Sequence, residues 1–271
     1  MMDVWLILLP AFIMMLCLLL THCYFGLHIL ARGIIFADLA LAQIAALGTS
    51  VAFLMGEQAH GINAQIYAFA ATFIAAAMFS QFHRIQNTTT REVTIGCVYV
   101  VSAALSIVIL SRSAQGMEEL KSMLNGNILW VSWQEIIVIA ILYLMVAVFH
   151  YIYRQKFYQL SFAKQFEKSR TYWEFLFFLS FAIIITLAVK VAGVLLVFAL
   201  LIIPAFSASL IQQSFKARLL LSWILGIAGS LAGLFVAVQY DLPVGATVVS
   251  LLGVLPLLAG TVITLRRMSA G

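Results

Sequence analysis

The chain reads YWEFLFFLSFAIIITLAVKVAGVLLVFALLIIPAFSASLI over residues 172–211. This stretch holds only two charged side chains, Glu174 and Lys190, and it is about twice as long as the roughly 20 residues that cross a bilayer as a helix. A helix is expected, because the hydrocarbon core offers no water to satisfy free backbone N–H and C=O groups. We predict two spans, 172–190 and 191–211, with a tight turn between Lys190 and Gly193. One long kinked segment is the alternative.

The rest of the chain repeats this apolar pattern. Of the 271 residues, 64% are hydrophobic and only 9% are charged, and the mean hydropathy is +1.10. A soluble domain of this length cannot hide so much apolar surface, whereas a bilayer makes its burial favourable. The further apolar runs lie at 4–25, 34–55, 62–82, 93–111, 129–152, 218–239 and 244–265. We therefore predict an all-α integral membrane protein, a polytopic bundle of eight or nine transmembrane helices that forms a single domain over residues 1–271.

The distribution of Lys and Arg predicts the orientation of the chain. If the N-terminus lies outside, twelve of the fifteen basic residues fall on the cytoplasmic side, and Arg112, Lys121 and Lys190 fall on the other. Such an excess is typical of cytoplasmic loops. We expect the N-terminus outside and the C-terminus in the cytoplasm, which requires an odd number of spans. Because the basic residues are dispersed among loops, the net charge of +5 does not indicate a nucleic-acid partner.

Asp38 is almost the only acid inside an apolar run once loop and helix-start residues are set aside. Ionisable residues within membrane spans usually face the interior of a bundle and mark a pathway or a specific contact. Gln43 follows five residues later and lies on a different face of a regular helix, because each residue turns the helix by about 100°. We expect Asp38 either to line an ion path or to hold a contact between helices.

The expected outer loops carry further acids. Glu57 lies near His60 in one of these loops, and Asp241 opens another. An acidic outer mouth concentrates cations near the membrane. The ordinary polarity of loops explains the same residues equally well.

Three Ser/Thr-x-x-Glu pairs precede or open apolar runs. They are Thr89 with Glu92, Ser132 with Glu135, and Thr171 with Glu174. In this spacing the hydroxyl and the carboxylate can each accept a hydrogen bond from a free N–H group at a helix start. We predict that all three glutamates cap helices.

The sequence lacks a G-x-x-x-x-G-K-[ST] phosphate-binding loop, so the chain does not bind ATP in the usual way. Secondary transporters and proton pumps normally bury several ionisable groups in the membrane, and here Asp38 is nearly alone. We therefore expect a transport subunit that is not an enzyme, that needs no cofactor, and whose energy comes from elsewhere.

Four segments together resemble the membrane subunit of ABC-type zinc, manganese and iron uptake systems. They are GIIFADLALAQIAALG at 33–48, LNGNILWVSW at 124–133, VAGVLLVFALLIIPA at 191–205 and DLPVGAT at 241–247. They occur in the order typical of that family, and the resemblance extends from about residue 26 to residue 265. Each is a weak signal alone, and the combination is specific.

The resemblance implies a homodimeric permease in the cytoplasmic membrane of a prokaryote, surrounded by lipid. Two copies of a separate cytoplasmic ATP-binding subunit would drive it, and an extracytoplasmic metal-binding protein would supply its cargo. The implied cargo is a divalent metal ion, with zinc or manganese first. Alternatives are an ABC permease for an iron complex or another small solute, a proton- or sodium-coupled secondary transporter, and a structural membrane protein.

In the family the surface that couples the permease to the ATPase follows the Ile-Ile-Pro-Ala helix, which here gives the segment 207–218. We expect Pro204 to break that helix, because proline removes a backbone donor, so that the chain turns into a short interfacial helix. The candidate coupling residues are Pro204, Ser207, Gln212, Gln213, Lys216 and Arg218.

One departure from the family concerns its second helix, which usually reads Asp-Ala-Leu-Ala-His. The acid and the imidazole at i and i+4 share one face and suit a borderline divalent metal. Here Leu39 and Gln43 stand at those two positions, and Asp38 is displaced by one residue. Either Asp38 substitutes from a rotated or unwound segment, or Asp38 and Gln43 make weaker oxygen contacts, or the cargo differs. The candidate metal and path residues are Asp38, Gln43, Glu57, His60 and Asp241.

Overall fold

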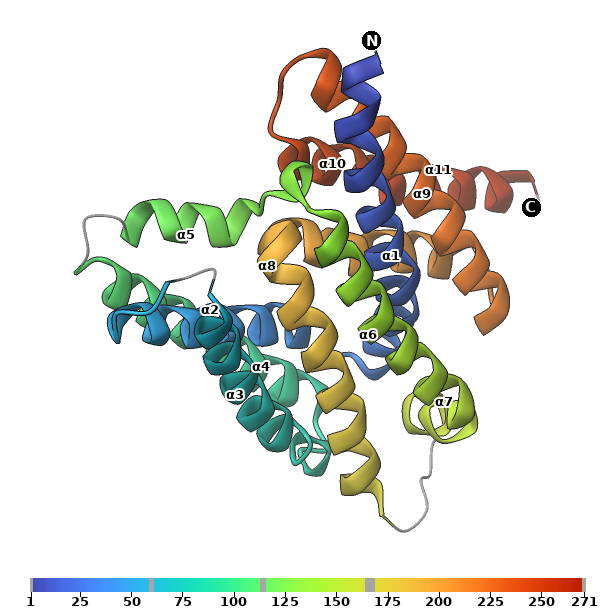
Figure 1. Ribbon diagram of the computed structural model, residues 1–271. Coiled ribbons are helices and arrows are strands. Elements are labelled where there is room, and N and C mark those ends of the chain that lie inside the picture. The colour runs from blue at the N-terminus through green and yellow to red at the C-terminus, as the bar shows by residue number, and fades with distance from the viewer. Residues whose placement is uncertain (1, 59–60, 113–115, 164–168, 270–271) are drawn as a thin grey trace. The chain divides into compact units, whose positions relative to one another are not determined.

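A computed structural model describes residues 2–58, 61–112, 116–163 and 169–269, and every regular element in these ranges is helical (Figure 1). The elements in chain order are α1 (Met2–Arg32), α2 (Phe36–Leu54), α3 (Ile62–Phe79), η1 (Phe82–Arg84), α4 (Thr88–Leu110), α5 (Gly116–Asn125), η2 (Ile128–Trp130), α6 (Trp133–Ile152), α7 (Arg154–Phe162), α8 (Arg170–Ile211), α9 (Phe215–Gln239), α10 (Val244–Leu252) and α11 (Val254–Ser269). The all-α prediction is confirmed.

Eight helical segments of the described residues are long and apolar enough to cross a membrane, and they coincide with the predicted runs. The count treats α8 as one helix of 42 residues, although Gly193 interrupts it with a φ of 75° and a ψ of 160°. Residues other than glycine hardly ever adopt this backbone conformation. The break that the sequence predicts between Lys190 and Gly193 therefore exists, and counting the two segments of α8 separately gives nine.

Two helices occupy stretches that the sequence predicts to be loops. Helix α5 lies in the segment between α4 and α6, and α7 lies in the basic segment before α8. Both are too short and too polar to cross a bilayer, so hydropathy alone could not reveal them.

The predicted caps have mixed outcomes. Ser132 and Glu135 form the expected reciprocal pair: the Ser132 backbone and hydroxyl donate to the Glu135 carboxylate at 3.0 and 2.9 Å, and the Glu135 N–H donates to the Ser132 hydroxyl at 3.2 Å. The prediction for Glu92 is wrong, because Asn87 caps α4 by accepting from the Thr90 N–H. The prediction for Glu174 is also wrong, because this carboxylate forms ion pairs instead.

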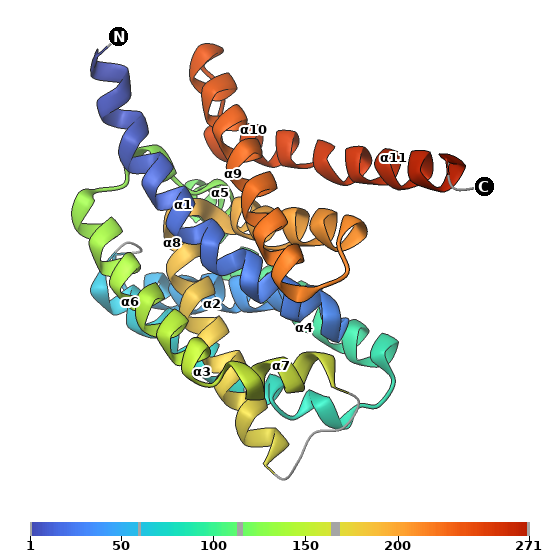
Figure 2. The same cartoon turned by 90° about the vertical axis from the view of Figure 1, so that its right-hand side faces the viewer.

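By its internal contacts the chain divides into two compact units. The first unit comprises Met1–Leu30, Asn127–Leu144 and Leu195–Gly271, and the second comprises Ala31–Gly126 and Met145–Val194. In the second unit α2 contacts both α3 and α4 (Figure 1). In the first unit α9 packs against α10 (Figure 2). The single transport domain over 1–271 stays a prediction.

Close helix contacts in the first unit depend on glycine. A Cβ atom on Gly26 of α1 would lie 2.0 Å from the Leu201 carbonyl oxygen, and one on Gly233 of α9 would lie 2.6 Å from the Val248 Cα. The backbones approach so closely at these positions that no other residue fits without movement.

Candidate functional site

The first turn of α2 buries a carboxyl group. Asp38 is 0% exposed, and neither of its side-chain oxygens has a hydrogen-bond partner among the described residues. Its neighbours Ala37, Ala40 and Leu41 are fully buried apolar residues, so the helix turns this face inward. An ionised carboxylate is unfavourable in such surroundings unless a partner compensates it. The site therefore suits a proton, a water molecule or a cation beside Asp38.

The orientation of α2 buries the side chain of Asp38 more completely than that of its neighbour Leu39. Leu39, which the resemblance places at the position of the family's acid, is only half-buried, whereas Asp38 is fully buried. Helix α2 is regular from Phe36 onward, so the idea that Asp38 lies on an unwound segment is wrong. Gln43 is also buried, at 5% exposure. The two side chains point about 140° apart around the helix axis, which rules out a shared face.

Two other candidate path residues, Glu57 and Asp241, lie in turns that follow helices. Glu57 follows the C-terminal end of α2, where one carboxylate oxygen accepts a hydrogen bond of 2.9 Å from the Asn63 amide. Helix α2 extends about 24 Å from Asp38 to its end at Leu54 at 1.5 Å per residue, so the two acids lie at opposite ends of this helix and do not meet. Asp241 is exposed in the turn after α9, in the first unit, with a positive φ of 52°. His60 lies outside the described residues.

A cluster of ionic side chains at the end of α1 holds the turn that leads into α2. The guanidinium of Arg32 pairs with the Glu174 carboxylate, which is 1% exposed, and lies 4.6 Å from the centre of the Phe177 ring. The Nε of Arg170 is 3.4 Å from the other Glu174 oxygen. Arg91 of α4 donates a hydrogen bond of 2.6 Å to the Arg32 carbonyl oxygen. One buried acid thus pairs with two arginines, and a third arginine binds the backbone at the end of α1.

A second acid fixes the first residue of α2. The Phe36 N–H donates a hydrogen bond of 2.8 Å to Glu92 of α4. Between Arg32 and Phe36 the chain passes through Gly33, whose φ is 59° and where a Cβ would lie 2.8 Å from the Thr88 side chain. These contacts tie the turn to α4 and α8. Because Asp38 follows Phe36 by two residues, they also fix where the buried carboxyl group lies.

This positioning role is not evident from the sequence. The three-residue spacing is a local signal that predicts helix caps for Glu92 and Glu174, whereas their partners Phe36 and Arg32 are distant in the chain. The arginines near the ends of α1, α4 and α8 were the signal that could have indicated a buried counter-ion.

We expect Glu174→Gln to lower the free energy of unfolding by about 3 kcal/mol, because removing one partner of a buried ion pair leaves charges without compensation. Thermal unfolding of the purified protein in detergent measures the effect. Glu118→Gln, an exposed acid on α5, should change stability by less than about 0.5 kcal/mol. Equal unfolding temperatures for the two variants would contradict this account of the cluster.

The expected helix break at Pro204 does not occur, and that prediction is wrong. Helix α8 continues through Pro204 to Ile211, and the next helix in the described part of the chain is the long helix α9. Proline cannot donate to the Leu200 carbonyl oxygen four residues earlier, and the Cys23 thiol lies 3.9 Å from that oxygen instead. Membrane helices tolerate proline when neighbouring groups satisfy the freed carbonyl in this way.

The candidate coupling residues differ in how far they reach the surface. Pro204 and Ser207 are buried, and the Ser207 hydroxyl donates to the Ile203 carbonyl within α8. The loop 212–214 joins α8 directly to α9, and the Arg218 Nε closes it with a hydrogen bond of 2.9 Å to the Gln212 carbonyl oxygen. The exposed candidates are Gln213 and Lys216.

Comparisons with known proteins identify a matching family and similar sequences. A family model described as the ABC 3 transport family matches residues 5–263. The chain is 25% identical to the manganese transport system membrane protein MntC of Listeria innocua serovar 6a, over 83% of this chain and 79% of that protein. It is also 25% identical to the manganese import system permease protein ScaB of Streptococcus gordonii, over 83% of this chain and 80% of that protein.

A solved structure has the same fold. The structure of PsaBC from Streptococcus pneumoniae in complex with Fab superposes with a TM-score of 0.75 at 21% sequence identity, covering 93% of this chain and 90% of the matched chain. The polytopic helical permease fold that the sequence predicts is therefore confirmed.

Proposed function

Because this chain belongs to the ABC 3 transport family, we propose that it is the membrane permease of an ABC importer for a divalent metal ion, with manganese ahead of zinc. The observation that carries the proposal is the buried carboxyl group of Asp38, whose two oxygens have no partner among the described residues. A multi-pass membrane protein that keeps such a group in its interior is expected to use it, since an idle one would be costly.

The donor chemistry favours manganese over zinc. No group of three or more His, Cys, Asp or Glu side chains in the described ranges could hold a metal ion. Zinc sites are built from imidazole and thiolate ligands, whereas manganese accepts carboxylate, carbonyl and water oxygens. A single carboxylate with an amide or water nearby binds weakly, which suits a conduit that must release its cargo. The names of the relatives, which refer to manganese transport, support the same choice.

The energy and the cargo come from partners in this proposal. The sequence has no phosphate-binding loop, so two copies of a separate ATP-binding subunit act on the cytoplasmic side. A metal-binding protein delivers the ion outside, and a second copy of the chain completes the permease in the lipid. One set of loops carries twelve of the fifteen basic residues, and such an excess is typical of the cytoplasmic side. The N-terminus therefore lies outside and the C-terminus in the cytoplasm.

The exposed residues after α8 should form the contact with the ATPase. We expect Lys216→Glu to lower ATP-dependent uptake roughly tenfold, because reversing a charge at an interface penalises association. Uptake into proteoliposomes and co-purification of the ATPase measure the effect. Lys121→Glu, an equally exposed change on α5, should leave both unchanged. Equal losses in the two variants would remove Lys216 from the coupling surface.

Cargo can be tested with the complex reconstituted in proteoliposomes and supplied with the binding protein. Radiolabelled manganese, zinc and iron are offered separately, and accumulation is compared with ATP and with a non-hydrolysable analogue. We expect manganese to accumulate with ATP and to be displaced by unlabelled manganese more effectively than by zinc. If none of the three metals accumulates, the metal assignment is wrong.

A further inference from the structure

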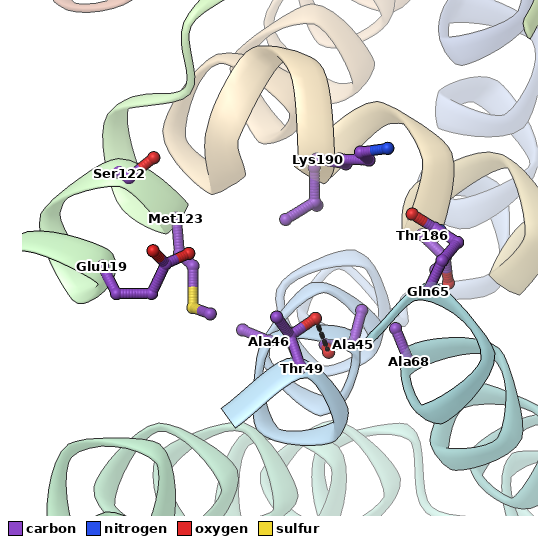
Figure 3. Close-up of a pocket in the computed structure, with 11 residues that line it drawn as sticks. Ala45, Ala46, Thr49, Gln65, Ala68, Glu119, Ser122, Met123, Thr186 and Lys190 are labelled. Atoms are coloured by element: carbon purple, nitrogen blue, oxygen red, sulfur yellow. Dashed lines mark hydrogen bonds between the residues drawn. The ribbon is translucent and has the colours of Figure 1, made fainter. Parts of the chain in front are cut away.

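A small cavity in the second unit lies among α2, α3, α5 and α8, and we call it the outer pocket (Figure 3). Its volume is about 40 Å³, and its polar lining comprises Thr49, Gln65, Glu119, Ser122, Thr186 and Lys190. A space of this size holds a water molecule or a small ion with part of its hydration shell. Neither Asp38 nor any other residue that the proposed function uses lines it.

We propose that the outer pocket is a second divalent-cation site, which the metal occupies before it reaches Asp38. This inference rests on the proposed function as a metal permease. The donors are one carboxylate, three hydroxyl groups and one amide oxygen, and the thioether of Met123 lies beside them. Oxygen donors of this kind suit manganese, magnesium or calcium, and neutral ones let much of the hydration shell stay in place.

The pocket and Asp38 share one stripe of α2. Ala45 and Thr49 line the pocket, and they follow Asp38 by seven and eleven residues, which returns a helix to nearly the same face. Thr49 lies about 16 Å farther along the axis at 1.5 Å per residue. The stripe between them carries Ala42 and Ala45, whose small side chains leave the most room along this face. With the orientation proposed above, the pocket lies on the outer side of Asp38.

The two charged side chains at the pocket face different ways. Figure 3 shows Glu119 and Met123 extending from α5 on one side, whereas the ammonium group of Lys190 lies on the opposite side, toward Thr186. Lys190 is exposed, so its charge is screened by solvent. Glu119 is half-buried, so its negative charge acts more strongly within the pocket. Glu118, the preceding residue on α5, is exposed and does not line the pocket.

The test measures manganese binding without relying on transport. The purified chain is placed in nanodiscs of phosphatidylcholine, and free Mn²⁺ is followed by room-temperature electron paramagnetic resonance. The Asp38→Asn background removes the inner site, so the remaining specific binding reports the outer pocket. In that background we expect Glu119→Gln to weaken binding roughly tenfold, as expected when one unit charge acts on a divalent ion across several ångström. Glu118→Gln is the matched control and should leave binding unchanged.

Removing a positive charge from the pocket should have the opposite effect on Mn²⁺ binding. Lys190→Gln should tighten binding roughly threefold, because it removes a repelling charge from the rim, whereas Lys121→Gln, an exposed change on α5 outside the pocket lining, should have no effect. Equal effects of Glu118→Gln and Glu119→Gln, weaker binding in Lys190→Gln, or no specific binding once Asp38 is replaced would each overturn the outer site.

The inference and the proposed function fail in distinguishable ways. If Mn²⁺ binding does not depend on Glu119 while the wild-type complex still accumulates manganese with ATP, the outer pocket alone is rejected. Persistence of that binding in a complex that accumulates no metal would reject the proposed function and keep the site. In all variants the unfolding temperature is recorded, so that a folding defect is not read as a binding defect.

Discussion

Asp38→Asn should reduce ATP-dependent manganese uptake roughly 100-fold, because it removes a carboxylate charge that acts on a divalent ion in surroundings of low dielectric constant. The folded protein should survive the change. Both carboxylate oxygens lack partners among the described residues, so no hydrogen bond or ion pair is lost, and a neutral amide is easier to bury. The measurements are uptake into proteoliposomes, ATP hydrolysis by the complex, and the unfolding temperature of the purified chain.

The control for this experiment is Glu135→Gln, which alters the capping acid at the start of α6. It should cost about 1 kcal/mol of stability at most and leave uptake intact. If Asp38→Asn instead unfolds the protein while uptake per folded molecule is unchanged, Asp38 holds a contact between helices. That is the alternative that the sequence leaves open, and the path assignment would then fall.

Gly193→Ala should prevent the chain from reaching its folded state. The φ of 75° and ψ of 160° at this position are essentially restricted to glycine, and a Cβ would lie 2.3 Å from the Gly126 nitrogen. Strain of about 1–3 kcal/mol adds to a backbone clash that cannot relax by moving a side chain. We expect the combined loss to exceed about 4 kcal/mol, which is a large part of the stability of most proteins.

The yield of monodisperse protein extracted from membranes measures this effect. Gly260→Ala is the matched control, because a Cβ at that position would meet no atom within 4 Å. Equal yields of the two variants would show that the chain bends at Gly193 without needing glycine there.

The close approach at Gly193 gives a physical reason for two of the segments that carry the family resemblance. A Cβ on Gly126 would lie 2.1 Å from the Ala192 carbonyl carbon, so each glycine leaves room for the backbone of the other. These residues are 67 positions apart, and both have a positive φ. The sequence shows two unrelated glycine motifs, and the structure shows that they form one junction inside the second unit.

The spans could be predicted from the sequence because each depends on a local property, a run of apolar residues long enough to cross the bilayer. The break in α8 was also accessible, since Lys190 and Gly193 interrupt the longest run. The prediction for Pro204 was wrong, because whether a proline ends a helix depends on which group satisfies the freed carbonyl. Here that group is the thiol of Cys23, which lies on a helix distant in the chain.

Some features of the candidate site could be predicted from the sequence, and others depend on the packing of the helices. Asp38 was identifiable as an acid in an apolar run, and its location in the first turn of a regular helix follows from the pattern. Its complete burial and unpartnered oxygens depend on the packing of α2 against α3 and α4, which the sequence does not specify. The ion pair between Glu174 and Arg32 joins residues 142 positions apart, and the outer pocket brings together residues from four helices, so neither is within the reach of a local motif.

The central claim is that this chain carries a metal ion at the expense of ATP hydrolysed by a separate subunit. The most direct test is accumulation of radiolabelled manganese by the reconstituted complex, in vesicles whose proton and sodium gradients are collapsed with ionophores. The account predicts accumulation above the external concentration whenever ATP is present, and none with the non-hydrolysable analogue. Accumulation that stops with the ionophores, or that an imposed proton or sodium gradient drives without ATP, would contradict it and identify a secondary transporter.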